Sequence, residues 1–166
     1  MSAALVSIVM GSASDREQMA ACSTALDRFG IAHEVRILSA HRTPDEATAY
    51  AAGLEGRGVR VVVAGAGMAA HLPGVLAAHT RLPVIGVPLS AGALQGFDAL
   101  LSIVQMPGGV PVATVGIGAA GAKNAGFLAA RILSLGDPAL RERMEAVVAD
   151  DRERVLAADR EAQAGG

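Results

Sequence analysis

Aromatic residues, cysteine and charge of one sign are all scarce in this chain of 166 residues. There is no tryptophan, one tyrosine and three phenylalanines, so a core must be built from alanine, valine, leucine and isoleucine. The single cysteine, Cys22, excludes an intrachain disulfide, and its amphipathic surroundings predict a buried, unreactive thiol. A formal net charge of −2, with no basic run and no aromatic stacking platform, argues against nucleic-acid binding.

Long hydrophobic runs are also missing. The first apolar run, at about residues 5–10, has no basic segment before it and is too short for a signal peptide or a membrane span. With 52% hydrophobic and 18% charged residues, the chain is expected to fold throughout. We therefore predict one domain over residues 1–166, no membrane segment and a cytoplasmic location.

Short apolar segments alternate with amphipathic ones five times. Strands are predicted at about 5–10, 34–38, 59–67, 82–88 and 109–118, and helices at about 15–29, 44–52, 69–78, 94–103 and 122–135. This alternation predicts an α/β fold over about residues 5–136, with a parallel sheet covered by helices on both faces. A further helix is predicted at about 137–162, where it packs on a neighbouring subunit or lies on the surface in solvent.

Parallel α/β sheets bind ligands beyond the carboxyl ends of their strands. The segments that follow the five strands here are "GSASD", "SAHRTP", "GAGMAAHLPG", "GVPLSAGALQG" and "GIGAAGAKNA". All are rich in small or polar residues, so their polar groups are expected to collect at one edge of the sheet.

The segment "GSASD" has the composition of an anion site. Gly11 permits a tight turn, and Ser12 and Ser14 can add hydroxyls to the free N–H groups at a helix start. Asp15 does not suit phosphate but can accept hydrogen bonds from a ribose diol. N-capping by Ser14 or Asp15 is the alternative interpretation.

The segment "SAHRTP" places three chemically useful side chains together. Arg42 offers several charged donors to a phosphate, and Ser39 offers a hydroxyl. His41 can move a proton near neutral pH, although a structural role in the turn is equally compatible with the sequence. Thr43, ahead of Pro44, is expected to cap the next helix.

Neither a nicotinamide cofactor nor a metal is expected. The segments "GAGMAAH" and "GIGAAG" resemble dinucleotide-binding fingerprints, but neither is followed by an acidic residue at the end of a next strand. Their glycines instead let backbone amides approach a small ligand. The four histidines have no accompanying cluster of cysteines or carboxylates, and no nucleophile elbow is present.

Taken together, the loops resemble a known family. "GSASD", "SAHRTP", "AGAGMAAHLPG" and "LLSIVQMPGGVPVATVGIGAAGAKNA" are similar to the signatures of class I N5-carboxyaminoimidazole ribonucleotide mutases of purine biosynthesis. The resemblance implies a flavodoxin-like three-layer α/β/α sandwich with an appended C-terminal helix, assembled as a homo-octamer. It also implies an isomerase that moves a carboxyl group within a ribonucleotide and needs no metal, nucleoside triphosphate or organic cofactor.

Site roles follow from the same resemblance. It implies that His41 is the catalytic acid and base. It implies substrate binding by Gly11, Ser12, Ser14, Asp15, Ser39, Arg42, Ala66, Gly67, His71 and Leu72. Three residues depart from the family pattern, namely Arg16, Met68 and Ala99. Met68 stands where many relatives have glycine, so it is expected to narrow the pocket or change its backbone freedom.

Two other functions remain compatible with the sequence. One is direct carboxylation of aminoimidazole ribonucleotide, and the other is noncatalytic nucleotide binding on the same fold.

Overall fold

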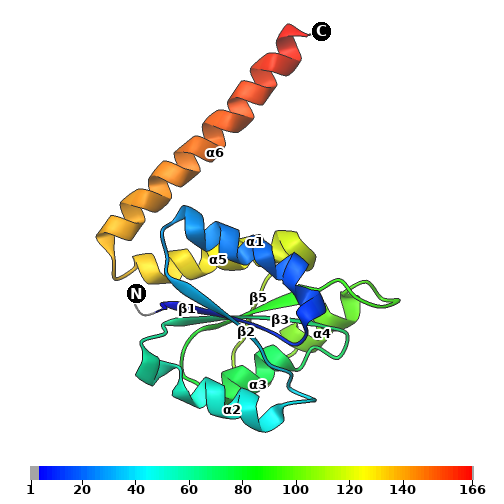
Figure 1. Cartoon of the computed structure of the whole chain (residues 1–166). Coiled ribbons are helices and arrows are strands. Elements are labelled where there is room, and N and C mark those ends of the chain that lie inside the picture. The colour runs from blue at the N-terminus through cyan, green and yellow to red at the C-terminus, as the bar shows by residue number, and fades with distance from the viewer. Residues whose placement is uncertain (1–3, 166) are drawn as a thin grey trace.

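A computed structural model describes residues 4–165 as a five-stranded parallel sheet between two layers of helices (Figure 1). The strands are β1 (Val6–Met10), β2 (His33–Ile37), β3 (Val61–Gly67), β4 (Val84–Leu89) and β5 (Ala113–Thr114). The α-helices are α1 (Arg16–Arg28), α2 (Pro44–Gly53), α3 (Leu72–His79), α4 (Phe97–Val104), α5 (Gly118–Ser134) and α6 (Pro138–Ala164). Two short 3₁₀ helices are η1 (Ala13–Asp15) and η2 (Glu55–Arg57).

The sheet order is β2-β1-β3-β4-β5, the flavodoxin-like order for a doubly wound fold. Met10, at the end of β1, pairs with Ile37 at the end of β2 and with Gly65 near the end of β3. Gly67 then pairs with Leu89 at the end of β4. This register brings the loops that follow these four strands to one edge, which confirms the predicted fold class.

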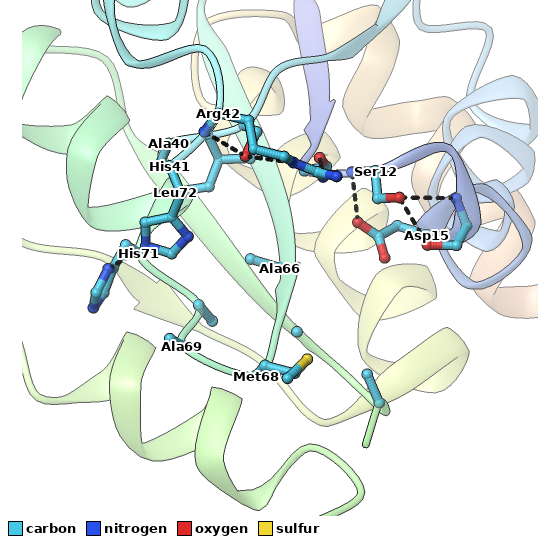
Figure 2. Close-up of a pocket in the computed structure, with 16 residues that line it drawn as sticks. Ser12, Asp15, Ala40, His41, Arg42, Ala66, Met68, Ala69, His71 and Leu72 are labelled. Atoms are coloured by element: carbon cyan, nitrogen blue, oxygen red, sulfur yellow. Dashed lines mark hydrogen bonds between the residues drawn. The ribbon is translucent and has the colours of Figure 1, made fainter.

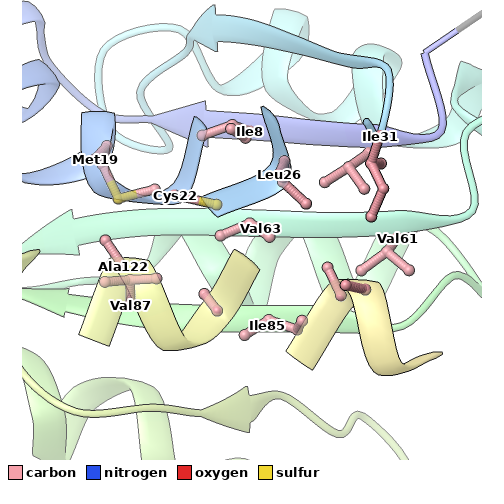
Figure 3. Packing of buried hydrophobic residues seen from close by; sticks show 14 of the residues in the cluster. Ile8, Met19, Cys22, Leu26, Ile31, Val61, Val63, Ile85, Val87 and Ala122 are labelled. Carbon is pink, nitrogen blue, oxygen red and sulfur yellow. The ribbon is translucent and has the colours of Figure 1, made fainter. Parts of the chain in front are cut away.

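Helices α1 and α5 cover one face of the sheet, and α2, α3 and α4 cover the other (Figure 1). Figure 3 shows the first layer, where small and branched side chains fill the space between helices and strands. Gly126 of α5 allows a close helix contact, since an added Cβ would lie 2.8 Å from the Ala25 Cβ of α1. Cys22 is fully buried in this layer, and burial raises its pKa to about 12, as expected for an unreactive thiol.

The fifth strand is much shorter than predicted. Only Ala113 and Thr114 pair with β4, although the apolar segment extends over 109–118. Pro111 lacks the N–H that a ladder requires, and the remainder of the segment turns toward α5. Helix α5 begins at Gly118, four residues earlier than predicted, because this glycine adopts a φ of +73° that starts the helix after a sharp turn.

Helix α6 projects away from the sandwich (Figure 1). Asp137 caps its first turn by accepting a hydrogen bond from the Leu140 N–H, and Leu140 and Met144 are buried against the core. Further along the helix, Val148 is 52% exposed and Val155 is 70% exposed. The outer half of α6 therefore presents apolar side chains that the single chain does not cover.

Candidate active site

A cavity of about 230 Å³ lies at the carboxyl edge of the sheet (Figure 2). All eleven site residues predicted from the sequence line this cavity: Gly11, Ser12, Ser14, Asp15, Ser39, His41, Arg42, Ala66, Gly67, His71 and Leu72. Met68, which the sequence analysis expected at the pocket, also lines it, and four further lining residues were not predicted: Ala40, Ala69, Ala70 and Ala91. Each lies in a loop that the sequence analysis had placed at the ligand edge. A small apolar side chain carries no chemical signal of its own, so these residues could be found only through their loops.

The start of η1 forms the polar end of the cavity. Ser12 is the N-cap of η1, because its Oγ accepts a hydrogen bond from the Ser14 N–H. Asp15, one of the two expected caps, occupies the N-cap position of α1, although its side chain makes no hydrogen bond to that helix. Asp15 completes a capping box, since its Oδ2 accepts from the Ser12 N–H at 2.9 Å. Burial raises the pKa of Asp15, and hydrogen bonds from Ser12 and Gly11 with the nearby Arg42 charge partly oppose that shift.

Arg42 ties two loops together across this end (Figure 2). Its Nη2 donates to the Gly11 carbonyl at 2.7 Å, and its Nε donates to the Ser39 Oγ at 3.4 Å. Ser39 is only 9% exposed and is the polar anchor of the β2–α2 loop. The guanidinium therefore sits between the β1 and β2 loops, with its other N–H groups free to meet an anion.

Thr43 occupies the N-cap position of α2, as predicted, but its side chain does not cap the helix. Its Oγ1 accepts from the Ser39 N–H at 2.9 Å and donates to the Ser39 carbonyl at 3.1 Å. This exchange closes the "SAHRTP" turn on itself and fixes the direction in which His41 leaves it.

His41 and His71 face one another across the cavity wall (Figure 2). The His41 Nε2 lies 2.6 Å from the His71 Nδ1, and the ring planes meet at 75°. A hydrogen bond between two ring nitrogens requires that one carries hydrogen and the other does not. Each imidazole therefore sets the hydrogen position of the other, which makes the pair suited to holding and moving one proton.

The loop after β3 supplies the apolar floor of the cavity. Met68 adopts a φ of +56°, a left-handed conformation that glycine takes more easily. Its side chain is 60% exposed, so it lies at the rim rather than filling the cavity. A Cβ added to Gly67 would lie 3.1 Å from the Ala91 Cβ, which shows how tightly the loops after β3 and β4 approach here.

The other two histidines lie outside the cavity. His33 begins β2 and is partly buried, with its Nδ1 near the Ile31 carbonyl. His79 ends α3, with its Nδ1 2.8 Å from the Val75 carbonyl. Within residues 4–165, no group of three or more histidine, cysteine or acidic side chains has the arrangement of a metal site. No helix in the same range is both long and apolar enough to span a bilayer.

Comparison with known proteins places this site in a family. A family profile described as AIR carboxylase matches residues 5–154, which is most of the chain. The chain belongs to the AIR carboxylase family. The site described above lies wholly within the matched residues.

Curated relatives in this family share about half of their residues with the chain. The N5-carboxyaminoimidazole ribonucleotide mutase of Pseudomonas aeruginosa is 53% identical over 92% of this chain and 94% of its own length. The proteins of the same name from Bacillus subtilis and Mycobacterium tuberculosis are 54% and 55% identical, over 92% and 95% of this chain. These matches cover 94% of the Bacillus subtilis protein and 90% of the Mycobacterium tuberculosis protein.

A solved structure agrees with the fold. The crystal structure of Treponema denticola PurE superimposes with a TM-score of 0.83 at 28% identity, and the match covers 93% of this chain and 95% of that one. The AIR carboxylase family assignment therefore rests on both sequence and structure.

Proposed function

We propose that this protein is an isomerase of purine biosynthesis that converts 5-(carboxyamino)imidazole ribonucleotide into 4-carboxy-5-aminoimidazole ribonucleotide. The observation that carries the proposal is the His41–His71 pair in the same small cavity as Arg42 and Asp15. The names of the relatives at 53–55% identity support the same activity.

The two ends of the cavity suit the two ends of such a substrate. Arg42, with the hydroxyls of Ser12 and Ser14, would bind the phosphate, because charged donors and hydroxyls gather at the start of η1. Asp15 would accept hydrogen bonds from the ribose diol through its outer carboxylate oxygen. The small residues of the β3–α3 loop leave an apolar space for the heterocycle.

The chemistry needs one group that first gives and then takes a proton. Cleavage of the bond between the exocyclic nitrogen and the carboxyl carbon releases carbon dioxide, and this nitrogen takes a proton from His41. The ring carbon then attacks carbon dioxide, forms the new C–C bond and returns its own proton to His41. Atoms and charge balance over the cycle, so His41 ends as it began and no external acid or base is consumed.

His71 would keep His41 in the correct orientation during this cycle. The 2.6 Å contact between the two ring nitrogens restrains the orientation of the His41 ring. Because His71 begins the loop-to-helix junction at α3, its backbone is anchored by the Val75 N–H, which donates to the His71 carbonyl at 3.0 Å. The pair is thus held from two different loops of the sheet edge.

Carbon dioxide must remain in place between the two steps. On this side the cavity of about 230 Å³ is walled by the small apolar side chains of Ala40, Ala66, Ala69, Ala70 and Ala91. Confinement replaces a bimolecular recapture by an effectively intramolecular step.

The direct test is interconversion of the two carboxylated isomers without added ATP or metal. We expect the wild-type protein to catalyse it and His41→Asn to lose about 10²–10⁴-fold in kcat, because acid–base catalysis contributes that range. Substrate binding by His41→Asn, measured by calorimetry, should persist. Near-normal turnover in the variant would contradict the role of His41, and a wild-type protein that binds but never turns over would indicate a noncatalytic module.

Direct carboxylation is the second candidate, because the family description itself is AIR carboxylase. Supplying aminoimidazole ribonucleotide with bicarbonate, in parallel with the carbamate isomer, separates the two activities. We expect efficient turnover only of the carbamate isomer.

A homo-octamer in the cytoplasm is also part of the proposal. Its structural support is an apolar face on and before α4, formed by Leu94, Phe97, Leu101 and Val104, each at least 49% exposed in the single chain. Such contiguous exposed apolar surface is typical of an interface. The outer half of α6 offers a second surface of the same kind. The cytoplasmic location follows from the proposed substrate, a charged ribonucleotide that does not cross membranes unaided.

A further inference from the structure

One side chain outside the cavity joins two of the loops that form it. Gln18 lies on α1, one helical turn beyond Asp15, and forms two hydrogen bonds with the backbone of Ser90. Its Nε2 donates to the Ser90 carbonyl at 3.1 Å, and its Oε1 accepts from the Ser90 N–H at 3.0 Å. The amide therefore pairs with the first residue after β4 much as a neighbouring strand would.

The segment that Gln18 holds has little other regular support. Between the end of β4 and the start of α4, the chain has left-handed φ angles at Gly92, Gln95 and Gly96. Ala91, the residue next to Ser90, lines the cavity and packs against Gly67. The position of Ala91 over the cavity thus depends on where Ser90 is fixed.

Gln18 also contacts the start of α5. A Cβ added to Gly118 would lie only 3.3 Å from the Gln18 Oε1, so the bare glycine leaves space for the amide. The loop after β4 and the segment after β5 therefore both meet helix α1, which directly follows Asp15 of the cavity. No other side chain of the described residues hydrogen-bonds to the Ser90 backbone.

We infer that Gln18 is a positioning residue that holds the β4–α4 loop over the cavity and so prevents carbon dioxide from escaping during the reaction. The inference rests on the proposed isomerisation. Gln18 does not line the cavity, and it acts through Ser90 and Ala91. Loosening the loop would leave N–C cleavage and protonation by His41 intact. The carbon dioxide released would then diffuse away and leave aminoimidazole ribonucleotide as a side product.

The experiment compares Gln18→Ala and Gln18→Glu with Glu17→Ala, a control at an exposed position on the same helix. The first measurement is hydrogen exchange of the 90–96 segment, followed by mass spectrometry. The second is the ratio of aminoimidazole ribonucleotide to the C-carboxylated product, after subtraction of spontaneous decarboxylation without enzyme. Thermal unfolding establishes that each variant is folded.

Two neutral hydrogen bonds shift a local opening equilibrium by about tenfold or more. We therefore expect Gln18→Ala to raise exchange in 90–96 and the side-product ratio by about tenfold each, with the control unchanged. In Gln18→Glu, an ionised carboxylate cannot donate to the Ser90 carbonyl, but a protonated one can. At neutral pH the carboxylate is ionised, so Gln18→Glu should also raise the side-product ratio above that of the wild type.

The outcomes separate the inference from the proposed function. Wild-type isomerisation with an unchanged side-product ratio in both Gln18 variants would overturn the inference and leave the function standing. Unchanged exchange in 90–96 would overturn it independently of any activity. A wild-type protein without isomerisation would instead refute the proposed function, and the inference would fall with it.

Discussion

Removal of the Arg42 side chain should weaken phosphate binding specifically. The guanidinium has five N–H donors, and the structure uses two of them, on the Gly11 carbonyl and the Ser39 hydroxyl. Three donors remain for a ligand at the polar end of the cavity. A hydrogen bond between charged groups contributes about 1.5–3 kcal/mol, and solvent exposure of Arg42 favours the lower value.

Two such bonds at the lower value amount to about 3 kcal/mol, or roughly a 10²-fold rise in KM for Arg42→Ala. Arg42→Lys keeps the charge but loses the planar fork, so a rise of about tenfold is expected. The kcat of both variants should change much less, because the reacting atoms lie at the histidine end of the cavity.

The assay measures kcat and KM for the carbamate ribonucleotide and for the matching nucleoside without phosphate. If Arg42 binds phosphate, Arg42→Ala should harm the nucleotide reaction about 10²-fold and the nucleoside reaction little. Arg60→Ala, an exposed position at the opposite, amino end of β3, is the control. An unchanged KM for the nucleotide, or equal losses for both substrates, would refute the reasoning.

Two further predictions concern stability and assembly. Tyr50→Phe should lower the free energy of unfolding by about 1–3 kcal/mol in chemical denaturation, because it leaves the fully buried Ser7 hydroxyl without its 2.7 Å partner. Burial alone would raise the pKa of Glu34, but hydrogen bonds from Tyr50 and Arg57 and the nearby arginine charges lower it overall from 4.5. The ionised Glu34 therefore contributes stability that is present above about pH 4.5 and is lost as the pH falls through its lowered pKa. Tyr50→Phe should show less of this acid-dependent loss of stability. An equal loss in both proteins would contradict the role of Tyr50 in lowering the pKa of Glu34. Leu101→Glu places a charge on the exposed apolar face of α4. If the protein forms the proposed octamer, this variant should have a smaller mass in light scattering than the wild type, whereas an unchanged octamer would exclude that face as an interface.

Most residues at the ligand edge of the sheet were predictable, because each strand and the loop that follows it can be recognised in one continuous segment of sequence. "VSIVMGSASD" contains a buried strand, the glycine that ends it and the polar residues beyond it. Since parallel strands with right-handed crossovers bring such loops to one edge, their residues had to lie near one another. The eleven nominated residues share a cavity for this reason.

Element boundaries were less predictable where backbone conformation rather than hydrophobicity decides them. Helix α3 starts at Leu72 instead of about residue 69, because the left-handed Met68 turns the chain before the helix can begin. The cap of η1 falls on Ser12, although Ser14 and Asp15 are equally good capping residues by type. Residue type alone does not distinguish between neighbouring serines as the cap.

The sequence by itself determined the α/β fold, the edge of the sheet where the ligand-binding loops gather, and the chemical character of each loop. These features depend on hydrophobic periodicity and residue type along short segments. Only the tertiary structure decided that His41 and His71 share a hydrogen bond, that Arg42 joins two loops and that Gln18 holds Ser90. These pairings join residues 30, 31 and 72 positions apart, and their geometry depends on how the loops leave the sheet to within an ångström. Periodicity along the chain carries no information at that scale.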